Sequence, residues 1–109
     1  MEDPKQVVEE TIHEKIDRIA LEKGVSAEKM HHIVKKESTY NANAVGDKNY
    51  MCARTSRIAP SHGLVQINEC WHPNVGDKAY DPEFALTFLA DHLKKGNCRL
   101  WSTCSKEWR

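Results

Sequence analysis

The predicted fold depends on the stretch Ile33-Val34-Lys35-Lys36-Glu37-Ser38-Thr39-Tyr40-Asn41. It ends a helix that we expect to begin after Ser26, which is a favourable N-cap residue. Glu37 follows Ile33 by four residues and Val34 by three, so its carboxyl is predicted on the apolar face of the helix. That face is formed by four side chains at helical spacing: Ala27, Met30, Ile33 and Val34.

This position gives Glu37 a physical reason to act as an acid. Removal from water disfavours the charged carboxylate, and the negative pole of the helix disfavours it as well. Both effects raise the pKa, which is how a general acid keeps its proton near neutral pH. The competing interpretation is the usual one for a glutamate at a helix end, namely a side chain that faces solvent or hydrogen-bonds a loop.

Two more helices are predicted on either side of this stretch. Asp3-Pro4-Lys5-Gln6 has the cap, proline and glutamine of a helix start, and the apolar periodicity continues to Gly24. Asp81-Pro82-Glu83 starts another helix in the same way, and Gly96-Asn97 ends it. The second of these is apolar on most sides, so we expect it to be the central buried helix.

The segment between these helices is predicted to be irregular. Residues 41–60 are rich in turn formers and sustain neither a helical nor a strand period. Gly63-Leu64-Val65-Gln66-Ile67 alternates apolar and polar residues briefly, which is enough for an extended segment or a short helical turn.

The composition is that of a single globular domain of 109 residues, with 39% apolar and 29% charged residues. Sixteen basic residues balance sixteen acidic ones, which argues against a nucleic-acid partner because such proteins present a basic face. No apolar run approaches the roughly 20 residues of a membrane span. Met1-Glu2-Asp3-Pro4 is unlike a secretory signal, so we expect either a cytosolic protein or one whose export signal has been removed.

The four cysteines, Cys52, Cys70, Cys98 and Cys104, fit a pair of disulfides and hence an oxidising compartment. Three pairings are possible, and proximity favours Cys52–Cys70 with Cys98–Cys104. The alternatives are four reduced thiols or a zinc module. Zinc prefers closer pairs such as C-x-x-C, so no metal site is predicted, although His62 and His72 lie near the first two cysteines.

Two motifs together indicate a family. The segment from Glu37-Ser38-Thr39-Tyr40-Asn41 to Gly46, followed by Ser61-His62-Gly63-Leu64-Val65-Gln66-Ile67-Asn68, resembles the soluble lytic transglycosylase domain, which is related to goose-type lysozymes. The resemblance covers roughly Ser26 to Thr103. It implies a mainly α, α+β lysozyme-like fold, with the whole chain, residues 1–109, as one such domain. The catalytic glutamate would end a helix, and an irregular loop and short extended segment would form the cleft.

The resemblance also implies a reaction and a setting. The substrate would be peptidoglycan, cleaved at the β-1,4 bond between N-acetylmuramic acid and N-acetylglucosamine. Glu37 would act first as acid and then as base, giving a 1,6-anhydro product without any cofactor. The expected partner is the glycan strand. We expect a monomer that acts in the periplasm, the cell envelope or the extracellular space.

The resemblance assigns four further positions. Ser38 would hydrogen-bond near Glu37 and help to fix it. Gln66 would contact the sugar beside the scissile bond, and Gly63 would let the backbone approach the ligand closely. Asn68 is a candidate sugar contact.

The chain departs from the family at one motif. The family carries Ala-Tyr-Asn after the buried helix, with the tyrosine beside the catalytic glutamate, whereas this chain has Trp101-Ser102-Thr103-Cys104, with cysteine near the tyrosine position. Either Trp101 and Thr103 form a divergent version of that wall, or the site is weakened. Trp101 and Trp108 are expected to cover the core or to line a sugar cleft.

Two other functions remain open at this stage. A hydrolytic lysozyme would use a second carboxylate to position water, for which Asp47 is the best candidate, with Glu69 and Asp77 behind it. The favoured explanation of Asp47 is nevertheless that it is a turn-forming residue. The second possibility is a weakly active or non-enzymatic glycan-binding relative that uses the same cleft.

Overall fold

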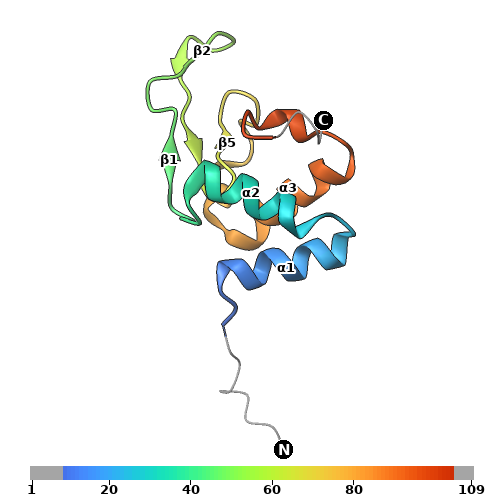
Figure 1. The fold of residues 1–109 in the computed structure, drawn as a ribbon. Helices are drawn as coiled ribbons and strands as arrows, with labels where there is room; N and C mark the ends of the chain where they lie inside the picture. The colour runs from blue at the N-terminus through green and yellow to red at the C-terminus, as the bar shows by residue number, and fades with distance from the viewer. Residues whose placement is uncertain (1–8, 105–109) are drawn as a thin grey trace, which may run out of the picture.

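The computed structural model describes residues 9–104, and it shows helices packed together with a small β region on one side (Figure 1). The helices are α1 (Ile12–Lys23), α2 (Ala27–Ser38) and α3 (Pro82–Lys94), with 3-10 helices η2 (Gly76–Tyr80) and η3 (Cys98–Leu100). Five short strands follow α2: β1 (Val45–Gly46), β2 (Met51–Cys52), β3 (Arg57–Ile58), β4 (Ser61–His62) and β5 (Ile67–Asn68). This is a small α+β fold, as the sequence predicted at that level.

Helix α1 begins later than the sequence predicted. Residues 9–11 are not helical, and the Asp3-Pro4 start lies outside the described residues. Thr11 is the N-cap: its hydroxyl accepts a hydrogen bond from Glu14 N, and the Glu14 side chain accepts one from Thr11 N. This capping box satisfies two backbone donors at once, which is why the helix starts at Ile12.

Helix α2 has the bounds and the buried face that its sequence predicted. The Ser26 side chain caps it by accepting from Lys29 N, and Met30, Ile33 and Val34 are fully buried. Thr39 ends the helix in the left-handed conformation, with φ of 53°. The chain therefore turns away immediately after Ser38, which leaves Glu37 at the last turn of the helix.

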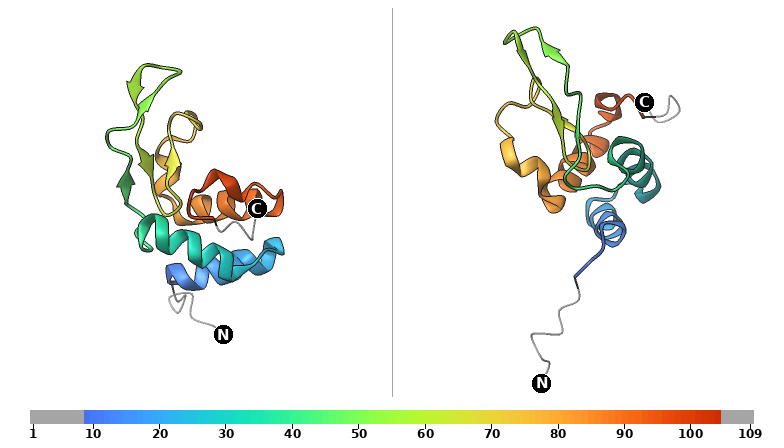
Figure 2. Two further views of the ribbon diagram at one scale, coloured as in Figure 1. Left: turned by 45° about the horizontal axis from the view of Figure 1, so that its top comes forward. Right: turned by 90° about the vertical axis from the view of Figure 1, so that its left-hand side faces the viewer.

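Helix α3 is the central helix. The Asp81 side chain caps it and Pro82 occupies its first turn. It packs against both α1 and α2 (Figure 2). Its buried residues, among them Leu86 and Leu89, belong to the same core as Leu64 and Val65, which precede β5. The Gly63–Ile67 segment is therefore anchored in the helical core.

The strands form two small antiparallel units. β4 lies between β1 and β5, with Val45 opposite His62 and Ser61 opposite Asn68. β2 and β3 form a separate ribbon that projects away from the helices (Figure 2). These strands are only two residues long, which explains why the sequence of residues 41–60 shows no sustained period.

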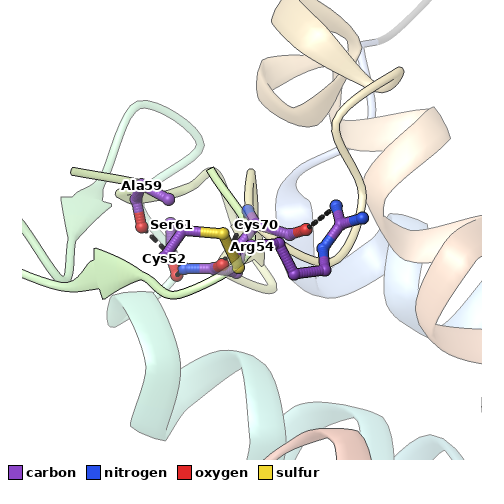
Figure 3. Close-up of a disulfide and its surroundings, with 6 residues drawn as sticks. Cys52, Arg54, Ala59, Ser61 and Cys70 are labelled. Atoms are coloured by element: carbon purple, nitrogen blue, oxygen red, sulfur yellow. Dashed lines mark hydrogen bonds between the residues drawn. A yellow bond between two sulfur atoms is a disulfide. The ribbon is translucent and has the colours of Figure 1, made fainter. Parts of the chain in front are cut away.

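Two disulfides join the pairs that proximity favoured, Cys52–Cys70 and Cys98–Cys104. The first ties the β2–β3 ribbon to the chain after β5, where Arg54 also donates to Cys70 O at 2.6 Å (Figure 3). The second closes a short loop after α3. Within residues 9–104, no helix has both the length and the apolar character needed to cross a bilayer.

Gly63, which follows β4 directly, lies against the backbone of η2. Its φ is +82°, and a Cβ at this position would lie 1.9 Å from the carbonyl oxygen of Ala79. The resemblance implied that Gly63 lets the backbone approach a ligand; in the structure, the direction in which a Cβ would project is filled by the backbone of Ala79. Glycine is required here for packing.

Gly63→Ala is expected to lower the free energy of unfolding by roughly 2–5 kcal/mol. The new Cβ would clash with the Ala79 carbonyl, and alanine is also unfavourable at a positive φ. Gly24→Ala is the matched control, since Gly24 has a φ of +71° and open space around it. It should cost only the strain, roughly 1–2 kcal/mol. Urea denaturation measures both, and equal losses would contradict the packing role of Gly63.

Candidate active site

Glu37 opens onto a surface groove of about 260 Å³. Its side chain is half-buried at the end of α2, and its Oε2 accepts a hydrogen bond of 2.8 Å from the Thr103 hydroxyl. The groove runs between the strand region and the loop after α3. It is lined by Glu37, Asp47, Tyr50, Ser61, Gln66, Asn68, Trp71, Leu100, Trp101 and Ser102.

The surroundings of Glu37 raise its pKa above the ordinary value of 4.5. Burial is the largest cause, and the negative charge of Asp47 acts in the same direction. The Thr103 hydroxyl opposes them, because its hydrogen bond stabilises the ionised carboxylate. The adjacent lysines, Lys35 and Lys36, are exposed. The direction of the shift is the one predicted from the apolar face of the helix.

Ser38 holds the end of α2 against the Gly63–Gln66 turn. Its hydroxyl lies 2.8 Å from Leu64 O and 3.1 Å from Val34 O, and it can donate to either carbonyl. Ser38 is not among the residues that line the groove. It fixes Glu37 indirectly, by joining the helix that carries the acid to the opposite wall.

Gln66 lines the groove from a strained backbone. Its φ is +53°, which costs free energy for a residue that is not glycine. The side-chain nitrogen donates to Gly63 O at 2.9 Å and to Ala44 O at 3.2 Å, which closes the turn. Gly46 makes room for the amide, since a Cβ there would lie 2.3 Å from Gln66 Oε1. The turn thus holds a polar side chain rigidly beside Glu37.

Asn68 also lines the groove, but its amide is largely used within the protein. Its nitrogen donates to Ala59 O at 2.8 Å and to Ser61 Oγ at 3.0 Å, while its oxygen accepts from Cys70 N at 2.9 Å. The structure places Asn68 in the predicted cleft, mainly as a brace between β4, β5 and the first disulfide.

Trp101 both covers the core and lines the groove. The ring is 4% exposed, and its Nε1 donates to Val65 O at 2.7 Å, so it covers the core. It also lines the groove. Thr103, two residues later, donates to Glu37. Trp108 lies outside the described residues.

Trp71 is a groove residue that the sequence reasoning missed. It is 62% exposed and lines both the groove and an adjoining recess of about 70 Å³. Phe88, Trp101 and His72 complete the aromatic side of this recess. The sequence signal was its place immediately after Cys70, close behind Gln66 and Asn68. An exposed tryptophan beside an acid gives the groove a flat apolar face.

Of the three carboxylates considered as partners of Glu37, the structure brings Asp47 into the groove. Ser61 Oγ donates to Asp47 Oδ2 at 2.6 Å, and Asp47 has a φ of +51°, so it is also a turn residue. Glu69 pairs with His62, and Asp77 lies in η2. Neither of those two lines the groove.

The described residues do not offer a metal centre. All four cysteines are in disulfides, and residues 9–104 contain no cluster of three or more histidine, cysteine or acidic side chains that could hold an ion.

Burial lowers the pKa of both His72 and His92, which favours neutral rings packed within the aromatic side of the fold.

Comparisons of the chain with protein-family models, with curated proteins and with solved structures found no match.

The raised pKa of Glu37 predicts a pH-dependent effect on stability. A carboxyl whose pKa is higher in the folded state stabilises the fold at low pH, and this contribution is lost as the pH rises through the folded pKa. Glu37→Gln removes the charge and keeps an acceptor for Thr103. We expect its melting temperature to exceed that of the wild type at neutral pH, and the difference to vanish well below pH 4.5.

Calorimetry from low to neutral pH measures the difference in melting temperature between Glu37→Gln and the wild type. Glu28→Gln is the control on the same helix, and it should not raise the melting temperature at neutral pH. If Glu37→Gln were destabilised equally at every pH, the result would contradict a raised pKa of Glu37 in the folded state.

Proposed function

We propose that this protein is a peptidoglycan lytic transglycosylase with a lysozyme-like fold. Glu37 is its acid and base, and the groove beside it receives the glycan strand. The proposal rests on the soluble lytic transglycosylase motifs at Glu37–Gly46 and Ser61–Asn68. It rests equally on the single observation that a half-buried carboxyl with a raised pKa opens onto a groove with an exposed tryptophan.

In the proposed reaction, protonated Glu37 donates its proton to the oxygen of the glycosidic bond. The bond breaks as positive charge develops at the sugar carbon and ring oxygen. Glu37, now ionised, takes the proton from the 6-hydroxyl of the same sugar, whose oxygen then bonds to that carbon. The product is a 1,6-anhydro sugar, and Glu37 is protonated again at the end.

This sequence of steps requires a carboxyl that is both protonated at first and competent as a base afterwards. The opposed influences on Glu37 suit that requirement, because burial and Asp47 favour its acid form while Thr103 favours its ionised form. A single carboxyl is then sufficient, since the substrate supplies the nucleophile.

The remaining walls of the groove suit a glycan. Trp71 presents a broad exposed ring, and sugar rings bind well to flat apolar faces that are flanked by polar groups. Gln66 supplies a fixed polar group beside Glu37. We place the protein outside the cytoplasm, in the periplasm, the cell envelope or the extracellular space, where two disulfides persist and peptidoglycan is accessible.

Glu37→Gln is expected to slow the release of soluble fragments from purified peptidoglycan by about 100- to 10 000-fold, because it removes the proton that the leaving oxygen needs. Mass spectrometry of the wild-type products should show 1,6-anhydro ends. Lys36→Gln, on the exposed side of the same helix turn, is the control. Equal and slow clearing by the wild type and Glu37→Gln would instead support a glycan-binding relative.

A second function is supported by one observation, namely that Asp47 shares the groove with Glu37. In a hydrolytic lysozyme, Asp47 would position a water molecule that attacks the sugar carbon, and the products would carry reducing ends. The contact from Ser61 would orient the carboxylate for this role.

Asp47→Asn separates the two functions. Under the proposed mechanism, the products keep 1,6-anhydro ends and the pKa of Glu37 falls, because a negative charge that raised it has been removed. The high-pH limb of the activity profile should therefore move to lower pH. Asp77→Asn removes the same charge outside the groove and should leave the profile in place. Reducing ends from the wild type, lost with Asp47→Asn, would favour the hydrolase.

A further inference from the structure

The loop closed by the Cys98–Cys104 disulfide supplies one wall of the groove. Leu100, Trp101 and Ser102 line it, and Thr103 donates to Glu37. Both half-cystines are buried, with 2% and 3% exposure. The loop that touches the acid is therefore bounded at each end by the same covalent bond.

Besides the bond from Thr103 to Glu37, two further hydrogen bonds among the described residues attach this loop to the rest of the site. The Trp101 ring nitrogen donates to Val65 O at 2.7 Å, which joins it to the Gly63–Gln66 turn. His32 Nε2 lies 3.1 Å from Thr103 O, which joins it to α2, five residues before Glu37. The helix that carries the acid thus also holds the backbone of the residue that contacts it.

Thr103 opposes every other described influence on the ionisation of Glu37. The charged and titratable groups that face the carboxyl across the groove are Asp47 and Tyr50, on the strand side. His32 approaches from α2, through its contact with Thr103. Burial and Asp47 raise the pKa of Glu37, while the Thr103 hydroxyl lowers it.

We propose that Thr103 is the positioning residue of Glu37, and that the Cys98–Cys104 disulfide keeps Thr103 in place, so that the acid is set for its reaction only while this bridge is closed. The catalytic consequence rests on the proposed function, whereas the dependence of Glu37 on the bridge does not. The Cys52–Cys70 disulfide has no such part, because it ties the β2–β3 ribbon to the chain after β5.

A dithiol reductant would open the bridge in a balanced step. The sulfur–sulfur bond takes up two electrons and two protons and becomes two thiols, while the dithiol becomes a cyclic disulfide. The five residues between the cysteines then lose their covalent closure, and Thr103 is no longer held on Glu37. In an oxidising compartment the bridge stays closed and the site stays assembled.

The test begins with Thr103→Val, which has nearly the same shape but no hydroxyl. We expect this substitution to raise the pKa of Glu37 by about one pH unit, because the carboxylate loses a hydrogen bond that stabilises its charge. Carbon-13 NMR of the Glu37 carboxyl measures this pKa. The high-pH limb of the activity profile should move up with it. Thr103→Ser keeps the hydroxyl and should restore both values, a rescue that a merely structural role would not give.

The role of the bridge is tested by a double-mutant cycle. In Cys98→Ser/Cys104→Ser, adding Thr103→Val should change the pKa of Glu37 no further. In Cys52→Ser/Cys70→Ser, the same substitution should have its full effect. If the first pair fails to fold, the cycle is run in Cys52→Ser/Cys70→Ser with and without dithiothreitol, which then acts on the remaining bridge.

Two results would overturn the proposal. The first is that Thr103→Val leaves the pKa of Glu37 unchanged, and the second is that it raises this pKa equally with the bridge open and closed. Either outcome is distinct from failure of the proposed function. That function fails if Glu37→Gln degrades peptidoglycan as the wild type does, while the NMR titration reports on Thr103 without any turnover.

Discussion

The candidate site depends on keeping one carboxyl partly out of water at the end of a helix. Glu37 lies at the C-terminal end of the buried face of α2, so the packing that stabilises the helix also desolvates the acid. The Thr103 hydroxyl limits the cost, because it satisfies one carboxylate oxygen. The balance between burial and this hydrogen bond is what makes the site chemically different from an ordinary helix end.

The opposite wall of the groove is held by short contacts rather than by long strands. Ser38 connects α2 to Leu64 O, Gln66 closes its own turn with two hydrogen bonds, and Gly63 lets that turn lie against η2. Leu64 and Val65 anchor the turn in the helical core. Two-residue strands are sufficient here because most of the order comes from that core and from side-chain hydrogen bonds.

The two disulfides hold segments that stand in different relations to the core. The β2–β3 ribbon lies outside the helical core and is tied down by Cys52–Cys70. The loop after α3 contributes Cys98, Trp101 and Cys104 to that core and is closed by Cys98–Cys104. In a domain of 109 residues the buried apolar surface is limited, so covalent closure of such segments contributes substantially to a single folded state. The groove lies between these two tied segments.

Sequence patterns alone identified the α2 and α3 helices and placed Glu37 on a buried face. For the cysteines, proximity favoured one of three possible pairings, and it is the one that the structure shows. Caps, helical periodicity and short loops act within a few residues, so they can be read without the fold. The contact of Thr103 with Glu37, 66 residues away, and the place of Trp71 in the groove depend on the tertiary structure. The structure also packs Gly63 against Ala79 and begins α1 at Ile12, where the capping box of Thr11 and Glu14 sets its start. Most of these outcomes depend on which distant surfaces pack together, and local sequence patterns do not carry that information.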